Sequence, residues 1–80
     1  MDIEALHRVS EVRRMLASGQ ARQRRKSLNM SLREVAAAVP ADPGTVSRWE
    51  NGRVTPRAAA ALKLADILGV TATNAMKSAA

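Results

Sequence analysis

The sequence predicts an all-α protein, a compact bundle of short helices. Apolar residues recur at spacings of three or four, as they do on one face of a helix, and runs that alternate apolar with polar residues are missing. Residue types that start or stop helices (Asp, Ser, Thr, Pro and Gly) also divide the chain into short segments. The length of 80 residues, of which 46% are hydrophobic, allows one domain with a small core.

The first predicted helix covers residues 2–17 and is amphipathic. Asp2 suits its N-cap position. Five apolar residues then form one stripe at helical spacing: Ile3, Leu6, Val9, Val12 and Leu16. Gly19 is expected to separate this helix from a second, basic helix that runs from about Gln20 to Leu28. The stripe has three possible partners, which are the protein's own core, a second copy in a homodimer, and a different protein.

A third helix is predicted from Ser31 to Val39. The Ser31 hydroxyl and the Glu34 carboxylate can each accept a hydrogen bond from the other residue's backbone amide, which makes a capping box. Pro40 ends this helix, since proline disfavours helical geometry in the residue before it.

After a tight turn over residues 40–42, a fourth helix is predicted from Pro43 to Glu50. Asp42 is its expected N-cap, and Pro43 takes the first helical position, where its missing amide hydrogen does no harm. Val46 and Trp49 lie three residues apart, so we interpret Trp49 as a core residue rather than a stacking platform. The Asn-Gly pair at 51–52 tolerates left-handed backbone and ends the helix.

The last long helix is rich in alanine. Thr55 and Pro56 are predicted to cap and open it, and Gly69 follows its end. Thr71 is expected to cap a short C-terminal helix or a frayed tail. The predicted organisation is therefore an N-terminal amphipathic helix (1–19), a helical domain (20–70) and a C-terminal segment (71–80).

The composition excludes several classes of function. With no cysteine and one histidine, the chain can form neither a disulfide scaffold nor a zinc finger. No nucleophile, base and orienting group can be combined, so we expect no enzyme, no metal, no cofactor and no small-molecule substrate. No apolar run approaches the roughly 20 residues that span a bilayer, which predicts a cytoplasmic protein without membrane association.

The positive charge is concentrated in one part of the chain. The net charge is +6, and the segment from Arg22 to Arg57 holds eight basic residues against three acidic ones. Such a segment is typical of proteins that bind a polyanion such as DNA. The alternative is a solvated surface that keeps a small protein soluble.

Residues 31–52, with the sequence SLREVAAAVPADPGTVSRWENG, carry the most specific pattern of the chain. Together with Pro56 and ALKLADILGV at residues 61–70, they resemble the Xre-like helix-turn-helix family of phage Cro proteins and phage repressors. The resemblance implies a helix-turn-helix bundle of five core helices, to which the N-terminal amphipathic helix is an addition. It also implies a nucleoid-associated regulator of transcription, Cro-like or a short repressor of a phage or prophage, that binds specific sequences of double-stranded DNA.

The resemblance assigns roles to three groups of residues. Helix 31–39 would cross the DNA backbone, and helix 43–50 would lie in the major groove, whose width of about 12 Å admits one helix. The residues expected to contact bases are Pro43, Gly44, Thr45, Ser47 and Arg48. Those expected to contact phosphates are Arg22, Arg25, Ser31, Leu32, Asn51 and Arg53. Those with a structural role are Glu34, Asp42, Val46, Trp49 and Glu50.

Arg48 is the main candidate for sequence specificity, because a guanidinium can bond guanine O6 and N7 together. Its alternative role is a phosphate contact. Arg25 and Glu50 match positions that form an ion pair in related proteins. Pro40 departs from the family pattern, because it replaces a glycine in the turn and cannot adopt positive φ. The Pro-Gly start of helix 43–50 also replaces larger polar residues, so specificity would depend more on Arg48 and on DNA shape.

The main alternative function is a protein-interaction module of the same fold that binds RNA polymerase, a toxin or a phage partner. Binding that weakens steeply with salt would favour DNA, and salt-insensitive binding to a protein would favour the module. If residues 2–17 mediate a homodimer, we expect two inverted half-sites about 10 to 10.5 base pairs apart.

Overall fold

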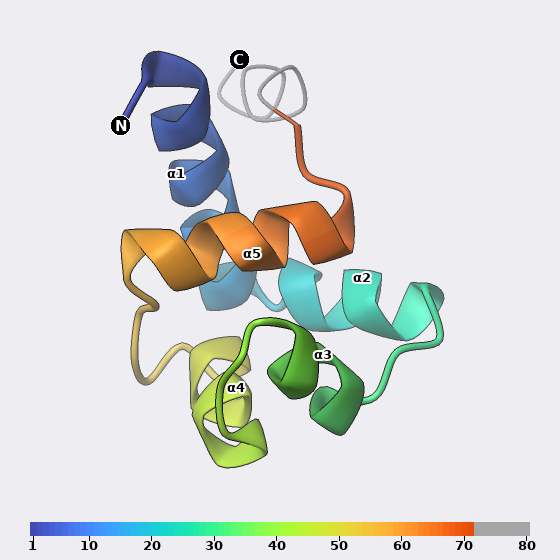
Figure 1. Ribbon diagram of the computed structural model, residues 1–80. Helices are drawn as coiled ribbons and strands as arrows, with labels where there is room; N and C mark the ends of the chain where they lie inside the picture. Colours follow the sequence, from blue (N-terminus) through green and yellow to red (C-terminus); the bar gives the residue numbers. More distant parts are fainter. Residues whose placement is uncertain (72–80) are drawn as a thin grey trace.

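The computed structural model describes residues 1–71 as an all-α bundle (Figure 1). Its helices are α1 (Ile3–Ser18), α2 (Gln20–Ser27), α3 (Leu32–Ala38), α4 (Pro43–Glu50) and α5 (Ala58–Leu68), and residues 1–71 contain no strand. The predicted all-α helix-turn-helix bundle is confirmed. The short C-terminal helix or tail expected after Thr71 lies outside the described residues.

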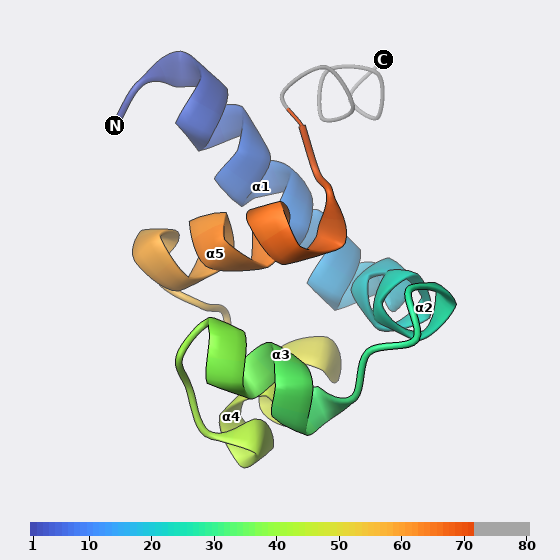
Figure 2. The same cartoon turned by 45° about the vertical axis from the view of Figure 1, so that its right-hand side comes forward.

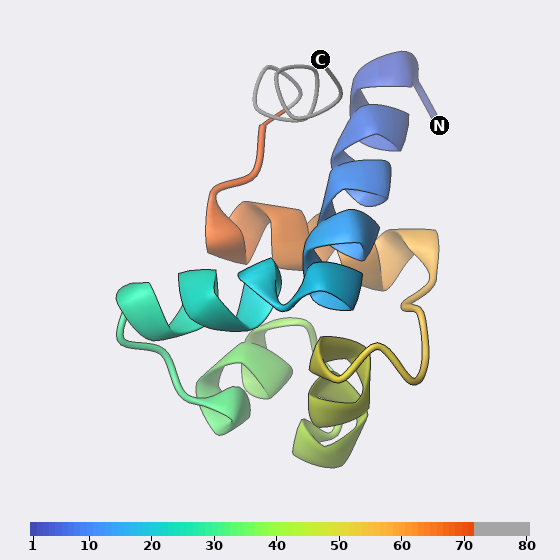
Figure 3. The same cartoon turned by 180° about the vertical axis from the view of Figure 1, so that it is seen from behind.

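The helices form two layers around one core. Helix α1 crosses α5 and packs mainly on it, while α3 and α4 lie together at the end of the molecule remote from the start of α1 (Figures 1 and 3). Every helix contributes to the core. Its buried apolar residues are Val9, Val12, Leu16, Ala21, Val35, Ala36, Val39, Val46, Trp49, Ala61, Leu64, Ala65, Leu68 and Val70.

Only part of the α1 stripe is buried. Val9, Val12 and Leu16 lie in the core, so the prediction that α1 folds back on its own bundle is confirmed for this half of the helix. Ile3 and Leu6 are 72% and 55% exposed, so the protein's own core covers only one half of the stripe. The cause is geometric, because the first turns of α1 extend past α5 (Figure 2).

Three arginine side chains fasten α1 and α2 to the two ends of α5. Arg8 Nε donates to the Val70 carbonyl at 2.9 Å, and Arg24 Nε donates to the Leu68 carbonyl at 2.9 Å. Arg13 donates from two nitrogens to the Pro56 carbonyl, before α5 begins. Leu68 is the last residue of α5, and the last carbonyls of a helix have no partner within it, so the bond from Arg24 satisfies a group that would otherwise depend on water. Helix α1 is therefore part of the same core as residues 20–70.

The boundary between α1 and α2 agrees with the prediction, and the start of α5 does not. Gly19 has φ +86° and separates α1 from α2, as predicted. The prediction that Thr55 and Pro56 open the last helix is wrong, because α5 starts at Ala58 with Arg57 as an extended N-cap. Pro56 is buried and its carbonyl is held by Arg13, so the chain stays outside the helix for two further residues.

Candidate nucleic-acid interface

The capping box at the start of α3 forms as predicted. Ser31 Oγ accepts a hydrogen bond from the Glu34 amide at 3.0 Å, and Glu34 Oε1 accepts one from the Ser31 amide at 2.9 Å. Hydrogen bonds from Ser31, first from its backbone amide and then from its side chain, lower the pKa of the Glu34 carboxyl. The predicted structural role of Glu34 is thus to fix the first turn of α3.

The turn between α3 and α4 accommodates Pro40 without a left-handed residue. The Val39–Pro40 peptide bond is cis, and residues 39–42 all have negative φ. The Ala41 amide donates to the Ala36 carbonyl at 2.7 Å, which closes the turn. The chain thereby reaches Asp42 in an extended conformation that suits an N-cap.

Helix α4 begins and faces the core as the sequence predicts. The Asp42 side chain accepts a hydrogen bond from the Gly44 amide at 2.8 Å, and Pro43 occupies the first turn. Val46 and Trp49 are 1% and 6% exposed, which confirms both as core residues.

The outer face of α4 follows from the position of its buried residues. At about 100° per residue, Gly44, Ser47 and Arg48 share the side opposite Val46 and Trp49. Thr45 lies at the edge of this face. Arg48 and Pro43 are exposed, and Gly44, Thr45 and Ser47 are half-buried. The five residues predicted to contact bases therefore belong to one end and one side of α4.

A buried ion pair joins α2 to α4. Arg25 Nε and NH2 donate to the two carboxylate oxygens of Glu50 at 2.7 and 3.1 Å, and Arg25 NH1 donates to the Met30 carbonyl at 2.9 Å. The side chains of Arg25 and Glu50 are only 9% and 8% exposed. The hydrogen bonds and the negative charge of Glu50 raise the pKa of Arg25 despite its burial. The ion pair between Arg25 and Glu50 is present as the family resemblance implied.

This geometry corrects the predicted phosphate contact of Arg25. Three of its nitrogens donate inside the protein and its side chain is covered, so its guanidinium cannot also reach a DNA backbone. Sequence position alone could not show this, because Arg22, Arg24 and Arg25 lie within four residues of each other.

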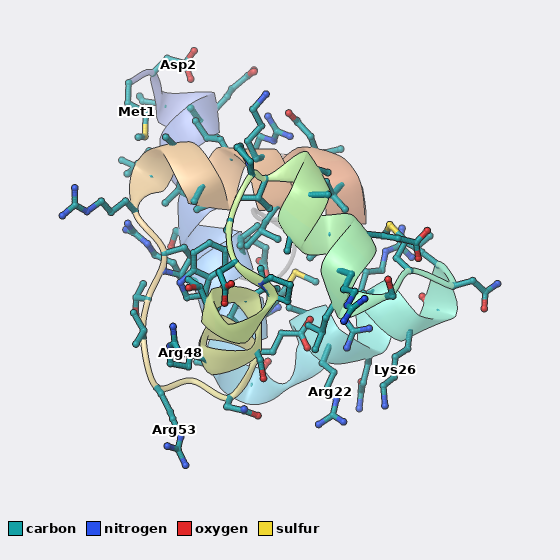
Figure 4. The ribbon with its side chains drawn as sticks, turned by 60° about the horizontal axis from the view of Figure 1, so that its bottom comes forward. Met1, Asp2, Arg22, Lys26, Arg48 and Arg53 are labelled. Atoms are coloured by element: carbon teal, nitrogen blue, oxygen red, sulfur yellow. The ribbon has the colours of Figure 1, made fainter. Side chains whose placement is uncertain are left out.

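Four exposed basic side chains lie on one side of the bundle. Figure 4 shows Arg22 and Lys26 of α2 pointing from the same side as Arg48 and Arg53, with Met1 and Asp2 on the opposite side. All four basic residues are exposed. Lys26 was not among the predicted phosphate contacts. Its signal in the sequence is its position four residues after Arg22, which places both on one face of a helix.

Arg48 also has a partner within its own helix. Its NH2 group donates to Thr45 Oγ1 at 3.1 Å. Asn51 is exposed directly after α4, and Leu32 is half-buried at the first position of α3. Of the predicted interface residues, Arg22, Arg48 and Arg53 thus lie on one side of the bundle (Figure 4).

A comparison with known proteins agrees with this arrangement. A model of the helix-turn-helix family matches residues 22–73. The chain belongs to the helix-turn-helix family, the one that contains Xre-like proteins, Cro and phage repressors. No curated protein and no solved structure matches significantly. The family binds DNA in regulating transcription, so residues 22–73 form a DNA-binding domain of this type.

Among the described helices, none is long and apolar enough to cross a membrane.

Proposed function

We propose that this protein is a sequence-specific regulator of transcription, Cro-like or a short repressor, that inserts α4 into the major groove of double-stranded DNA. One observation carries the proposal. The outer face of α4 is exposed on the same side of the bundle as Arg22, Lys26 and Arg53 (Figure 4). Phosphates flank a groove on both sides, so a reading helix with basic side chains around it matches the charge pattern of the duplex. Such a regulator would act on the nucleoid in the cytoplasm.

Base contacts would come from the outer face of α4. Pro43, Gly44 and Ser47 present small groups that let the helix approach the base edges closely, and Arg48 is the long donor among them. We expect Arg48 to bond a guanine, because its guanidinium is the one charged group on this face. A small contact set of this kind leaves room for specificity through DNA shape.

Phosphate contacts would come from the surrounding elements. Arg22, Lys26 and Arg53 supply charge, and Asn51 can donate from its amide. The Ser31 and Leu32 positions at the start of α3 complete the set implied by the family. The Ser31 amide already donates to Glu34, and the Ser31 hydroxyl accepts from the Glu34 amide, so the donors left for a phosphate are the hydroxyl hydrogen of Ser31 and the Leu32 amide.

The test combines selection of bound duplexes from random DNA with titrations at several salt concentrations. If three basic side chains neutralise phosphates, log affinity should fall with log salt at a slope of about 3, since each phosphate contributes about 0.9. Arg22→Gln should reduce this slope by about 1 on every sequence. Affinity that does not change with salt would remove the DNA hypothesis.

A protein-interaction role has one observation in its favour, the uncovered end of α1. Met1, Ile3 and Leu6 are all more than half exposed there. Figure 4 shows Met1 on the side opposite the basic side chains. A homodimer or a different protein partner would cover them. Sedimentation of the wild type and of Leu6→Asp, with and without DNA, decides between a self-associating and a monomeric chain.

A further inference from the structure

The guanidinium of Arg48 is held at the amino-terminal end of α4 by its own helix. Its NH2 group donates to Thr45 Oγ1, one turn earlier, at 3.1 Å. Side chains of a helix tilt towards its amino terminus, so the pair brings the charge towards the first turn. The other N–H donors of Arg48 have no partner in residues 1–71 and stay available to a ligand.

Gly44 lies close to both the N-cap carboxylate and the Arg48 guanidinium. A Cβ atom at position 44 would lie 3.7 Å from Arg48 NH1 and only 2.8 Å from Asp42 Oδ2. A Cβ at this position would therefore push against the N-cap carboxylate, whereas it would meet the guanidinium only in ordinary van der Waals contact. Because residue 44 is glycine, its amide can donate to the Asp42 carboxylate without a clash between that carboxylate and a Cβ atom.

The position of Thr45 on α4 separates it from the groove-facing side. At about 100° per residue it lies at the edge of the face that Gly44, Ser47 and Arg48 share, and it is half-buried. A threonine hydroxyl offers both a donor and acceptor sites, so it can accept from Arg48 and fix one orientation of a flexible side chain. Fixing that orientation before binding reduces the entropy that the arginine loses on the DNA.

We propose that Thr45 is a positioning residue, which orients Arg48 for one base pair and does not read a base itself. This inference rests on the proposed function and deepens it. Specificity then depends on the Thr45 and Arg48 side chains acting together. Thr45, which the family resemblance places among the base contacts, acts on the DNA through Arg48.

The test is a double-mutant cycle on the full chain, with duplexes obtained by selection and variants of them at each base pair. Thr45→Val keeps the branched shape and removes the hydroxyl, while Thr45→Ser keeps the hydroxyl and is the matched control. Thr45→Val should lower the preference at one base pair about two- to tenfold, which is the worth of one hydrogen bond. Thr45→Ser should keep the preference, and both variants should melt like the wild type.

The Arg48→Ala background distinguishes positioning from direct contact. If Thr45 acts through Arg48, Thr45→Val added to Arg48→Ala should not change the preference further. An equal effect of Thr45→Val with and without Arg48 would overturn the inference, because the threonine would then contact the base itself. Loss of preference in Thr45→Ser would also overturn it, since the methyl group would be responsible. A wild-type protein that binds no DNA would remove the proposed function and this inference with it.

Discussion

Replacing Arg25 by alanine should destabilise the fold far more than it affects any DNA contact. The substitution leaves the Glu50 carboxylate, whose side chain is 8% exposed, without its bidentate partner. Breaking a buried ion pair by removing one member costs about 3–5 kcal/mol, because an uncompensated charge remains in a poorly solvated site. Arg25 also donates to the Met30 carbonyl, so the α2–α3 connection loses a hydrogen bond as well.

Small domains have a free energy of unfolding of about 5–15 kcal/mol, so this loss removes a large share of the stability. A change of 1 kcal/mol shifts the melting temperature of a domain this size by about 4–8 °C. The expected fall for Arg25→Ala is therefore at least about 12 °C. The chain has one tryptophan, Trp49, which is next to Glu50 in sequence and is 6% exposed. Its fluorescence can therefore be used to follow unfolding in urea.

Two further variants make the test specific to the ion pair. Arg22→Ala removes an exposed arginine from the same helix and should change the free energy of unfolding by less than about 0.5 kcal/mol. The double variant Arg25→Met with Glu50→Met replaces both charges with apolar groups and should recover much of the loss, since no buried charge is left alone. If Arg25→Ala unfolds at the same urea concentration as Arg22→Ala, the buried pair contributes no stability and the reasoning fails.

Three other predictions concern binding and acid. Arg48→Ala should cost about 1–3 kcal/mol on the preferred duplex and much less on scrambled DNA, and equal losses in filter binding would make Arg48 a phosphate contact. The pKa of Glu34 is lower in the fold than its ordinary value of 4.5, so its contribution to stability is present above that value and is lost as pH falls through the folded pKa. Urea unfolding of wild type and Glu34→Gln, which keeps the capping geometry, should show a difference that disappears in acid. A homodimer held by Met1, Ile3 and Leu6 would direct its two basic faces apart, so selected DNA should contain single half-sites, and inverted pairs one helical turn apart would contradict this.

Features that depend on neighbouring residues were predictable from the sequence. Ser31 and Glu34 form their capping box, and Asp42 caps α4, because each bond joins residues that are two or three positions apart. The inward faces of Val46 and Trp49 followed from helical periodicity. The fold class and the position of the turn could therefore be derived without tertiary information.

Features that depend on distant contacts could not be derived in this way. Residues 56 and 57 stay outside α5, and the Pro56 carbonyl accepts hydrogen bonds from Arg13, which is 43 residues away. The exposure of Ile3 and Leu6 depends on where α5 crosses α1, although the two residues continue the stripe of Val9 and Val12. A hydrophobic pattern shows which face of a helix is apolar but not how far along the helix a partner extends.

Arg25 and Arg48 differ in burial, and this difference gives them different roles in the proposed mechanism. Arg25 is buried with its carboxylate partner and joins α2 to α4, the helix that we propose lies in the major groove. Arg48 is exposed and held by a neutral hydroxyl, so most of its donors stay free. An ion pair at Arg48 would neutralise the charge that a guanine or phosphate attracts, whereas a threonine orients the guanidinium and leaves its charge unchanged. A buried charge pair thus joins α4 to α2, and the base preference that we propose depends on an arginine that has no such partner.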